Sequence, residues 1–231
     1  MGKRDWFNAA INNDISFIMT NIHKYSQKLD TSSCSPHQKG ISALFLAIIN
    51  GNSQIVDFLL DYEINITSTH MFTVSAPNFY DIILYPGSTA LHVAFAAQDY
   101  TLGASLLDRV TQPDSQGDPP VALAPICRPC PSLEQLFDNV NFINQLKKCP
   151  TFLHNCALFG RFILIRKIVE KIVSGDHELA LFVKNQMEHK VDGMNVYDLA
   201  ICQIDEGKTG CSKADKVTLI DALKELEDVL Q

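Results

Sequence analysis

Residues 42–60 read SALFLAIINGNSQIVDFLL, and this pattern recurs twice along the chain. Residues 89–107 read TALHVAFAAQDYTLGASLL, and residues 151–169 read TFLHNCALFGRFILIRKIV. The three stretches align without a gap. Each begins with Ser or Thr, has Leu at the third place, and closes with an apolar pair at the eighteenth and nineteenth places. Repetition of a unit of this kind is typical of a solenoid, in which stacked neighbours bury a shared core.

The repeated pattern predicts a helix, a tight turn and a second helix. The initial Ser or Thr is a natural N-cap, and a small residue at the sixth place lets the helices approach closely. Gly51 and Gly160 stand at the tenth place and suit a left-handed turn. The second half then carries an apolar stripe at helical spacing, which in the first copy consists of Ile55, Val56, Leu59 and Leu60.

The repeats resemble the ankyrin family, whose signature is G-x-T-P-L-H-x-A. Residues 87–94 read GSTALHVA and residues 40–47 read GISALFLA. Weaker copies are residues 6–22, with Asn13-Asp14 at the turn, and residues 193–200, followed by a second helix expected over 216–230. The resemblance implies an all-α ankyrin solenoid with nearly no strand. About five repeats are expected in a single domain, near residues 4–30, 40–67, 87–110, 149–174 and 192–231.

The repeats are unevenly spaced, because equivalent first positions are Arg4, Ser42, Thr89, Thr151 and Asn195. The longest insertion covers residues 111–148. Six prolines predict a loop over 111–131, and apolar residues at helical spacing predict one helix over 132–148. This helix is expected to pack on the solenoid, with partner binding as the alternative. A hidden further repeat also fits the length, but the prolines disfavour its first helix.

Candidate contact residues follow from the resemblance, which implies protein binding through the loops and the concave ends of the first helices. The apolar side chains among them, such as Phe159, are unusual for a solvated face and favour a contact site. Folding of the insertions over these side chains is the alternative. The predicted partner-binding residues are Ile41, Ile49, Asn50, Ser88, Ala97, Leu158, Phe159 and Met194.

Two histidines stand at the fourth place of their repeats, His92 and His154. In the ankyrin family this histidine makes structural hydrogen bonds around the helix start and the adjacent loop. The other repeats have Phe45 and Asp198 at this place, so the histidines form no row. We expect both to be structural.

The insertion contains a CxxC motif, Cys127-Arg128-Pro129-Cys130. Zinc needs four ligands, and Cys149, His154 and Cys156 are the candidates downstream. A zinc site built on Cys127, Cys130 and Cys149 is the minor alternative to free thiols. A thioredoxin-like role lacks its βαβ context. The chain has seven cysteines and no visible signal peptide, which favours a reducing, cytoplasmic compartment.

Composition narrows the function classes. The chain has 231 residues, a net charge of −7 and a pI near 5.4, so neither nucleic acid nor an anionic membrane is an expected partner. No nucleophile motif, Walker loop or cofactor motif appears. We therefore expect a monomeric protein-binding module without a cofactor. The alternative is an enzyme, or a regulatory fragment of one, with chemistry in the insertions or in an absent domain. The spacing resembles ankyrin effectors that intracellular bacteria or viruses place in the host cytoplasm.

Overall fold

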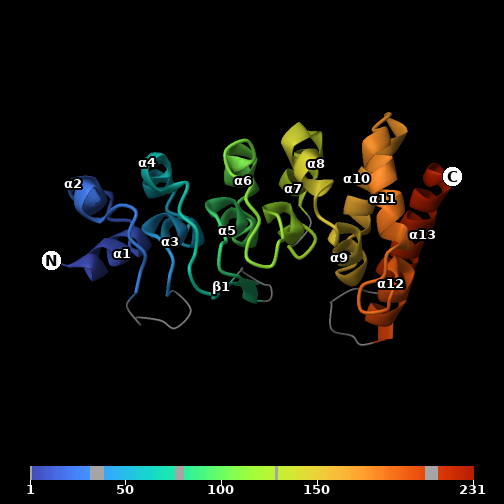
Figure 1. Cartoon of the computed structure of the whole chain (residues 1–231), viewed down its shortest axis with the longest axis horizontal. Coiled ribbons are helices and arrows are strands. Elements are labelled where there is room, and N and C mark those ends of the chain that lie inside the picture. Colours follow the sequence, from blue (N-terminus) through green and yellow to red (C-terminus); the bar gives the residue numbers. More distant parts are fainter. Residues whose placement is uncertain (1, 32–38, 76–80, 128–129, 206–212) are drawn as a thin grey trace. The chain divides into compact units, whose positions relative to one another are not determined.

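The structure is a computed structural model that describes residues 2–31, 39–75, 81–127, 130–205 and 213–231. Helix pairs dominate it, as the all-α solenoid pattern predicts (Figure 1). The chain divides into two compact units. Unit 1 is Met1–Pro120 and unit 2 is Val121–Gln231.

Unit 1 contains three helix pairs in the predicted order. Its first helices contact one another in the order α1, α3, α5, and α2 contacts α4. Ser42 and Thr89 are the N-caps of α3 and α5, as predicted, and α1 begins at Lys3, one residue before the first position Arg4. The pairs are α1 (Lys3–Ile11) with α2 (Ile15–Tyr25), α3 (Ala43–Ile49) with α4 (Ser53–Glu63), and α5 (Ala90–Ala96) with α6 (Tyr100–Leu106).

The turn inside each of these pairs uses one left-handed residue. Asn13 has φ 59°, Gly51 has φ 68° and Gln98 has φ 61°. In unit 2, Gly160 has φ 66° at the same place. The predicted turn at Asn13 is therefore confirmed, and the repeat tolerates Asn or Gln where glycine is the ordinary choice.

A β-hairpin stands between the second and third pairs, so the expectation of nearly no strand is wrong there. Strands β1 (Phe72–Ser75) and β2 (Asp81–Leu84) pair antiparallel, with Phe72 opposite Leu84. The two strands alternate buried and outward residues. This period of two is visible in the sequence, but it differs from the helical period on which the repeat assignment rests.

Unit 2 also consists of helices, and one of them stands between two helix pairs of the repeat pattern. The additional helix is α11, which contacts α9 and α10. Among the described residues, no helix of the chain has both the length and the apolar character needed to cross a membrane. The helices are α7 (Pro131–Gln135), the short 3₁₀ helix η3 (Leu136–Asp138), α8 (Val140–Leu146), α9 (Phe152–Leu158), α10 (Phe162–Val173), α11 (His177–Glu188), α12 (Val196–Asp205) and α13 (Lys213–Leu230).

The insertion at 111–148 differs from its prediction in both halves. A 3₁₀ helix, η2 (Pro120–Leu123), lies inside the expected loop, and residues 119–125 are buried. Pro120 opens this helix, where its missing N–H costs no intrahelical bond. The expected single helix over 132–148 is interrupted at Asn139. The Asn139 side chain instead accepts hydrogen bonds from the backbone N–H groups of Asn141 and Phe142 and caps α8.

These corrections reveal a hidden repeat. Gly117 has φ 86°, like Gly87 with φ 86° and Gly40 with φ 80°, and it precedes η2 as those glycines precede α3 and α5. Gly117 follows Gly87 by 30 residues, which is close to one ankyrin period. Residues 117–146 therefore follow the repeat order of turn, first helix and second helix, although the first helix is short and the second is interrupted.

A shared contact supports the same register. In unit 1, the Asn52 side chain donates to the carbonyl oxygens of Ala10 and Ile11 at 2.7 and 3.0 Å. In unit 2, the Arg161 side chain donates to the carbonyl oxygens of Pro125 and Ile126 at 2.8 and 3.3 Å. Each donor follows the left-handed turn residue of its repeat, and each pair of acceptors lies at the seventh and eighth places of the preceding repeat.

Candidate partner-binding surface

In unit 1, the predicted contact residues at the ends of the first helices are accessible. Ile49 ends α3 and is half-buried, and Asn50 behind it is exposed. Asn50 donates its side-chain amide to the Leu46 carbonyl oxygen at 2.8 Å, which closes the last turn of the helix. Ala97 has the corresponding place after α5 and is half-buried. These residues present a small, mixed polar and apolar surface.

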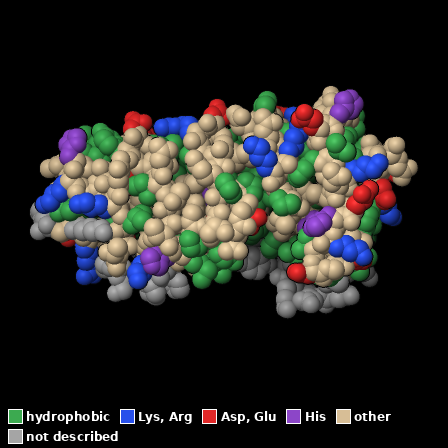
Figure 2. Space-filling view, viewed as in Figure 1, with side chains coloured by type: hydrophobic (Ala, Val, Ile, Leu, Met, Phe, Trp, Pro, Cys, Tyr) green, Lys and Arg blue, Asp and Glu red, His purple; other side chains and the backbone are tan. Residues whose placement is uncertain are grey.

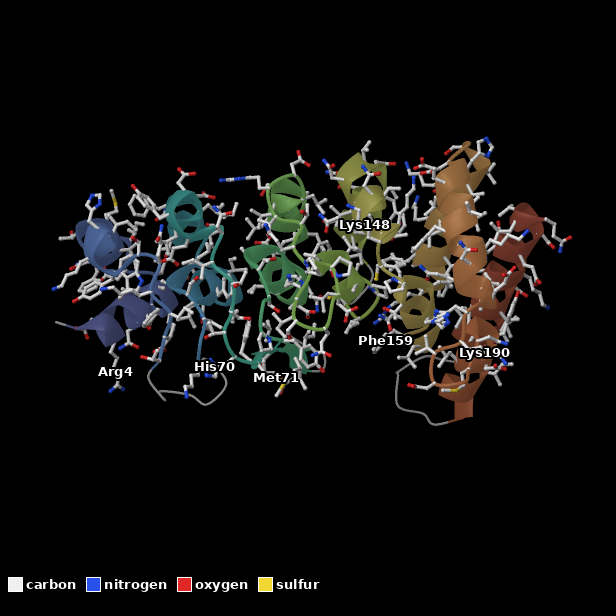
Figure 3. The ribbon with its side chains drawn as sticks, viewed as in Figure 1. Arg4, His70, Met71, Lys148, Phe159 and Lys190 are labelled. Carbon is white, nitrogen blue, oxygen red and sulfur yellow. The ribbon has the colours of Figure 1, made fainter. Side chains whose placement is uncertain are left out.

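In unit 2, the corresponding surface is more apolar. Leu158 ends α9, Phe159 is its C-cap residue, and both are half-buried. Figure 3 shows Phe159 beside α9. Met194 is half-buried in a turn closed by an isolated bridge to Val191. Each of these three side chains keeps some accessible apolar surface.

Two of the predicted contact residues are fully buried, so the accessible surface excludes them. The Ile41 carbonyl oxygen accepts from the Asp30 N–H at 2.8 Å, and its side chain lies in the core. Ser88 donates its hydroxyl to the Tyr85 carbonyl oxygen at 2.7 Å. Both positions follow a glycine turn, and the backbone bonds that close the inter-repeat loops draw them inward.

The two histidines have structural partners, as expected. His92 Nδ1 accepts from the Thr89 N–H at 3.1 Å, which leaves the proton on Nε2, 3.2 Å from the Asp118 carbonyl oxygen. Burial lowers the pKa of His92 to about 4. His154 Nε2 lies 3.1 Å from the His189 carbonyl oxygen, and burial lowers the pKa of this histidine too. Both imidazoles tie a helix start to a later loop.

The zinc alternative finds no support in the geometry. Cys127 and Cys149 are buried, and Cys130 is half-buried. Over the described ranges, no three His, Cys, Asp or Glu side chains gather as a metal site. Burial raises the pKa of Cys156 well above its ordinary value, so this thiol stays protonated. Arg128 and Pro129 of the CxxC motif lie outside the described residues.

Two of the hollows on the surfaces of the units are each lined by at least two acidic residues. One of about 310 Å³ lies among α11, α12 and α13, where the Tyr197 hydroxyl donates to Glu227 Oε2 at 2.9 Å. The other, of about 250 Å³, lies beside α4 and α6 in unit 1, with Asp57 and Asp99 in its lining. Neither lining contains a histidine next to a hydroxyl or thiol, so neither presents a Ser–His or Cys–His pair of described residues.

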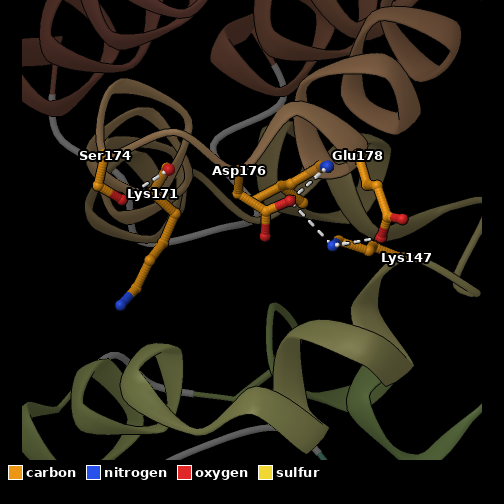
Figure 4. Close-up of polar contacts among 6 residues, drawn as sticks. Lys147, Lys171, Ser174, Asp176 and Glu178 are labelled. Atoms are coloured by element: carbon orange, nitrogen blue, oxygen red, sulfur yellow. Dashed lines mark hydrogen bonds and ion pairs between the residues drawn. The ribbon is translucent and has the colours of Figure 1, made fainter.

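Ion pairs fasten the additional helix α11 in unit 2. The Lys147 ammonium lies 2.9 Å from an Asp176 carboxylate oxygen and 3.2 Å from Glu178 Oε2 (Figure 4). Asp176 also caps α11 by accepting from the Leu179 N–H. Asp176 and Glu178 therefore serve at the start of α11.

One exposed apolar surface was not predicted from the sequence. It lies on the outward side of the β1–β2 hairpin. Met71 is 56% exposed, Ile83 is 51% exposed and Tyr85 is 38% exposed. Figure 2 shows hydrophobic side chains gathered along this edge of unit 1. The alternation of Phe72 and Val74 with polar residues was the signal that locates the strands.

Comparison with known proteins supports the repeat assignment. The family model for ankyrin repeats, in three copies, matches residues 6–124, which is just over half of the chain. The match extends to Ala124 and so includes the start of the hidden repeat. A search of the curated proteins found no match. Ankyrin repeats are in general protein-interaction modules. The chain belongs to the ankyrin repeat family.

Proposed function

We propose that this chain is a protein-binding module that contacts its partner through the ends of its first helices and the loops between repeats. The observation that carries the proposal is the accessible apolar surface of Leu158 and Phe159 at the end of α9. Neighbouring apolar side chains that stay accessible on a surface mark a contact site more often than single scattered ones do. The general role of ankyrin repeats supports the same conclusion.

The remaining accessible residues complete the proposed surface. Met194 adds to it in unit 2, and Ile49, Asn50 and Ala97 offer a second, more polar contact in unit 1. Aromatic anchors at interface centres carry a large share of binding energy, with neutral contacts around them. We therefore place the strongest contact at Phe159.

We propose that the chain has no catalytic activity of its own and that it acts as a monomer. The uneven repeat spacing supports the finer proposal that it works as an effector in the cytoplasm of a host cell. Turnover screening of the purified chain against common hydrolase and transferase substrates addresses the alternative, an enzyme. The proposal is contradicted if substrate turnover co-purifies with the chain and is lost when a residue of the chain is substituted.

Site-specific photo-crosslinking tests the surface directly. A photoreactive phenylalanine analogue replaces Phe159 in one variant and Val173 in another, and each is exposed to cell lysate. Val173 is 69% exposed at the end of α10 and serves as the control. We expect one partner to be captured from position 159 and to be absent from position 173. Equal capture at both positions contradicts the assignment.

The affinity for the captured partner then gives the size of the contact. Loss of an aromatic anchor costs about 2 kcal/mol or more, so Phe159→Ala is expected to weaken binding about thirtyfold. Thermal unfolding is expected to change little. If the variant instead loses about 3–5 kcal/mol of stability, Phe159 belongs to the core and the surface assignment fails.

A further inference from the structure

The β1–β2 hairpin is firmly held on unit 1. Its inward side chains include Phe72, whose ring stacks 6.2 Å from the ring of Phe45 on α3. The loop that leads into it is bound on both sides: the Thr69 N–H donates to the Gly40 carbonyl oxygen at 2.9 Å, and the Ser68 N–H donates to the Ser88 carbonyl oxygen at 2.9 Å. A platform held in this way displays its outward side chains without an ordering cost on binding.

The outward side of the hairpin is apolar at its centre. Ile83 lies opposite Thr73 in the strand register, and its side chain is 51% exposed. Met71 and Tyr85, which flank the next pair, are exposed on the same side. Natural edge strands are usually protected by lysine, proline or a bulge. Here the described strands contain no lysine and no proline, so their protection rests on their short length and on Asp81, and the apolar side chains at the centre stay open.

The two strands also have unused backbone edges. The sheet has two strands only, and neither makes a backbone hydrogen bond on its outer edge to any described residue. An extended peptide that joins such an edge gains main-chain hydrogen bonds, and every second one of its side chains packs beside the outward apolar side chains of the hairpin. The hairpin therefore suits an extended segment better than a helix.

The charges beside the hairpin select the segment. Lys39 is exposed, and the turn that it forms with Gly40 lies against His70, next to Met71. Gly40 has φ 80°, and a Cβ there would lie 2.5 Å from His70 Nδ1, so this turn is held close to the hairpin. Figure 3 shows His70 and Met71 together on the loop side of unit 1. Asp81, the acid on the same side, lies at the opposite end of the strands, where it accepts from the Ser75 hydroxyl at 2.8 Å.

Resting on the proposed protein-binding function, we infer that the outward side of the β1–β2 hairpin binds an extended segment of the partner, apolar at its centre and acidic at the end that lies toward Lys39 and His70. The apolar residues cover Met71 and Ile83, and an acidic residue meets Lys39 and His70. The area is small for a stable dimer, which needs about 1,200 Å² or more in total, so a second copy of this chain fits less well.

Defined peptides test this inference without knowledge of the partner. One fluorescent peptide alternates Thr and Ile between Glu residues, and its twin has Lys in place of Glu. With the full chain, we expect the acidic peptide to bind at least about fivefold more tightly, and Lys39→Glu to remove that preference. Equal affinity of the two peptides, or no binding of either, overturns the inference.

Matched variants locate the site. Met71→Ser and Ile83→Ser are each expected to weaken the acidic peptide about tenfold, because each removes a central apolar contact. Met19→Ser and Ile201→Ser are the controls, since Met19 is 56% and Ile201 52% exposed outside the hairpin. Equal losses in variants and controls overturn the assignment. So does a dimer in sedimentation that Ile83→Ser abolishes, because a second copy then occupies the hairpin.

The same experiment separates this inference from the proposed function. If Phe159→Ala weakens capture of the natural partner but Ile83→Ser leaves its affinity unchanged, the module binds a protein and the hairpin inference fails. If the chain binds the acidic peptide but position 159 captures no partner, the hairpin inference holds and the α9 surface fails.

Discussion

The two units satisfy the start of a first helix in different ways. In unit 1, the Leu44 N–H near the start of α3 donates to Glu63 Oε2 at 2.9 Å. In unit 2, the Leu153 N–H at the equivalent place in α9 donates to Gln186 Oε1 at 2.8 Å. Both acceptors are buried. Glu63 lies on α4, and Gln186 lies on α11. One backbone requirement is therefore met by a carboxylate in one unit and by an amide in the other.

The neighbouring groups explain the choice. The other oxygen of Glu63 accepts from the Gln27 N–H at 3.2 Å, so both of its oxygens face donors. Gln186 instead donates its Nε2 to the Cys149 carbonyl oxygen at 2.9 Å. An ionised carboxylate can only accept hydrogen bonds, whereas an amide both accepts and donates them. Burial raises the pKa of Glu63, although its backbone donors act in the opposite direction.

The histidines show the same contrast. Thr89 has extended backbone, with ψ 174°, and its hydroxyl and N–H both reach His92 Nδ1. Thr151 has ψ 4°, and the buried Nδ1 of His154 has no hydrogen-bond partner among the described residues. The same Thr-x-Leu-His motif therefore forms a closed capping box at Thr89, where the N-cap threonine is extended, and not at Thr151, where it is not.

Exchange of the amide for a carboxylate gives the largest expected effect. Gln186→Glu places an acceptor against the Cys149 carbonyl oxygen and buries a charge, which we expect to lower the free energy of unfolding by about 3 kcal/mol at pH 7. The loss shrinks as the pH falls, because the protonated acid can donate to that carbonyl. Urea unfolding at pH 7 and pH 5 measures both effects. Gln135→Glu on the exposed side of α7 is the control, and an equal loss there contradicts the argument.

Acid is expected to weaken unit 1 through His92. The pKa of His92 is lowered in the fold to about 4, so the unfolded chain binds a proton first and stability falls as the pH drops from about 6.5 to 4. A lowering of this size corresponds to roughly 3 kcal/mol. Unfolding of wild type and His92→Phe across this range measures the contribution, which the variant lacks. Phe45 already occupies this place in α3. Identical pH slopes for the two proteins contradict the assignment.

Glu63→Gln is expected to give the smallest effect. The new amide accepts from Leu44 but turns an N–H toward the Gln27 N–H, so one hydrogen bond is lost, at a cost of about 1 kcal/mol. Because the pKa of Glu63 is raised in the fold, its contribution is present below the ordinary pKa of 4.5 and is lost as the pH rises through the raised value. Wild type is therefore expected to gain on the variant as the pH falls from 7 toward 4.5. A constant difference contradicts this.

Much of the fold was predictable from the sequence because the repeat is a local pattern. The N-caps at Ser42 and Thr89, the turn at Asn13 and the helix pairs depend on residues a few places apart. The hidden repeat was not predictable in this way. Its prolines resemble loop residues, and the contact that marks its register joins Arg161 to Pro125, 36 residues away.

Of the candidate surface, the sequence placed Leu158 and Phe159 correctly at the end of a first helix, because helical register is local. Burial of Ile41 and Ser88 depended on backbone bonds to loops elsewhere in the chain, such as that from Asp30. The sequence by itself determined that this protein is a stack of helix pairs with left-handed turns. Only the tertiary structure decided which buried side chain accepts a hydrogen bond from the backbone at each helix start, and which apolar side chains stay accessible to a partner. Both depend on contacts between residues far apart in the chain.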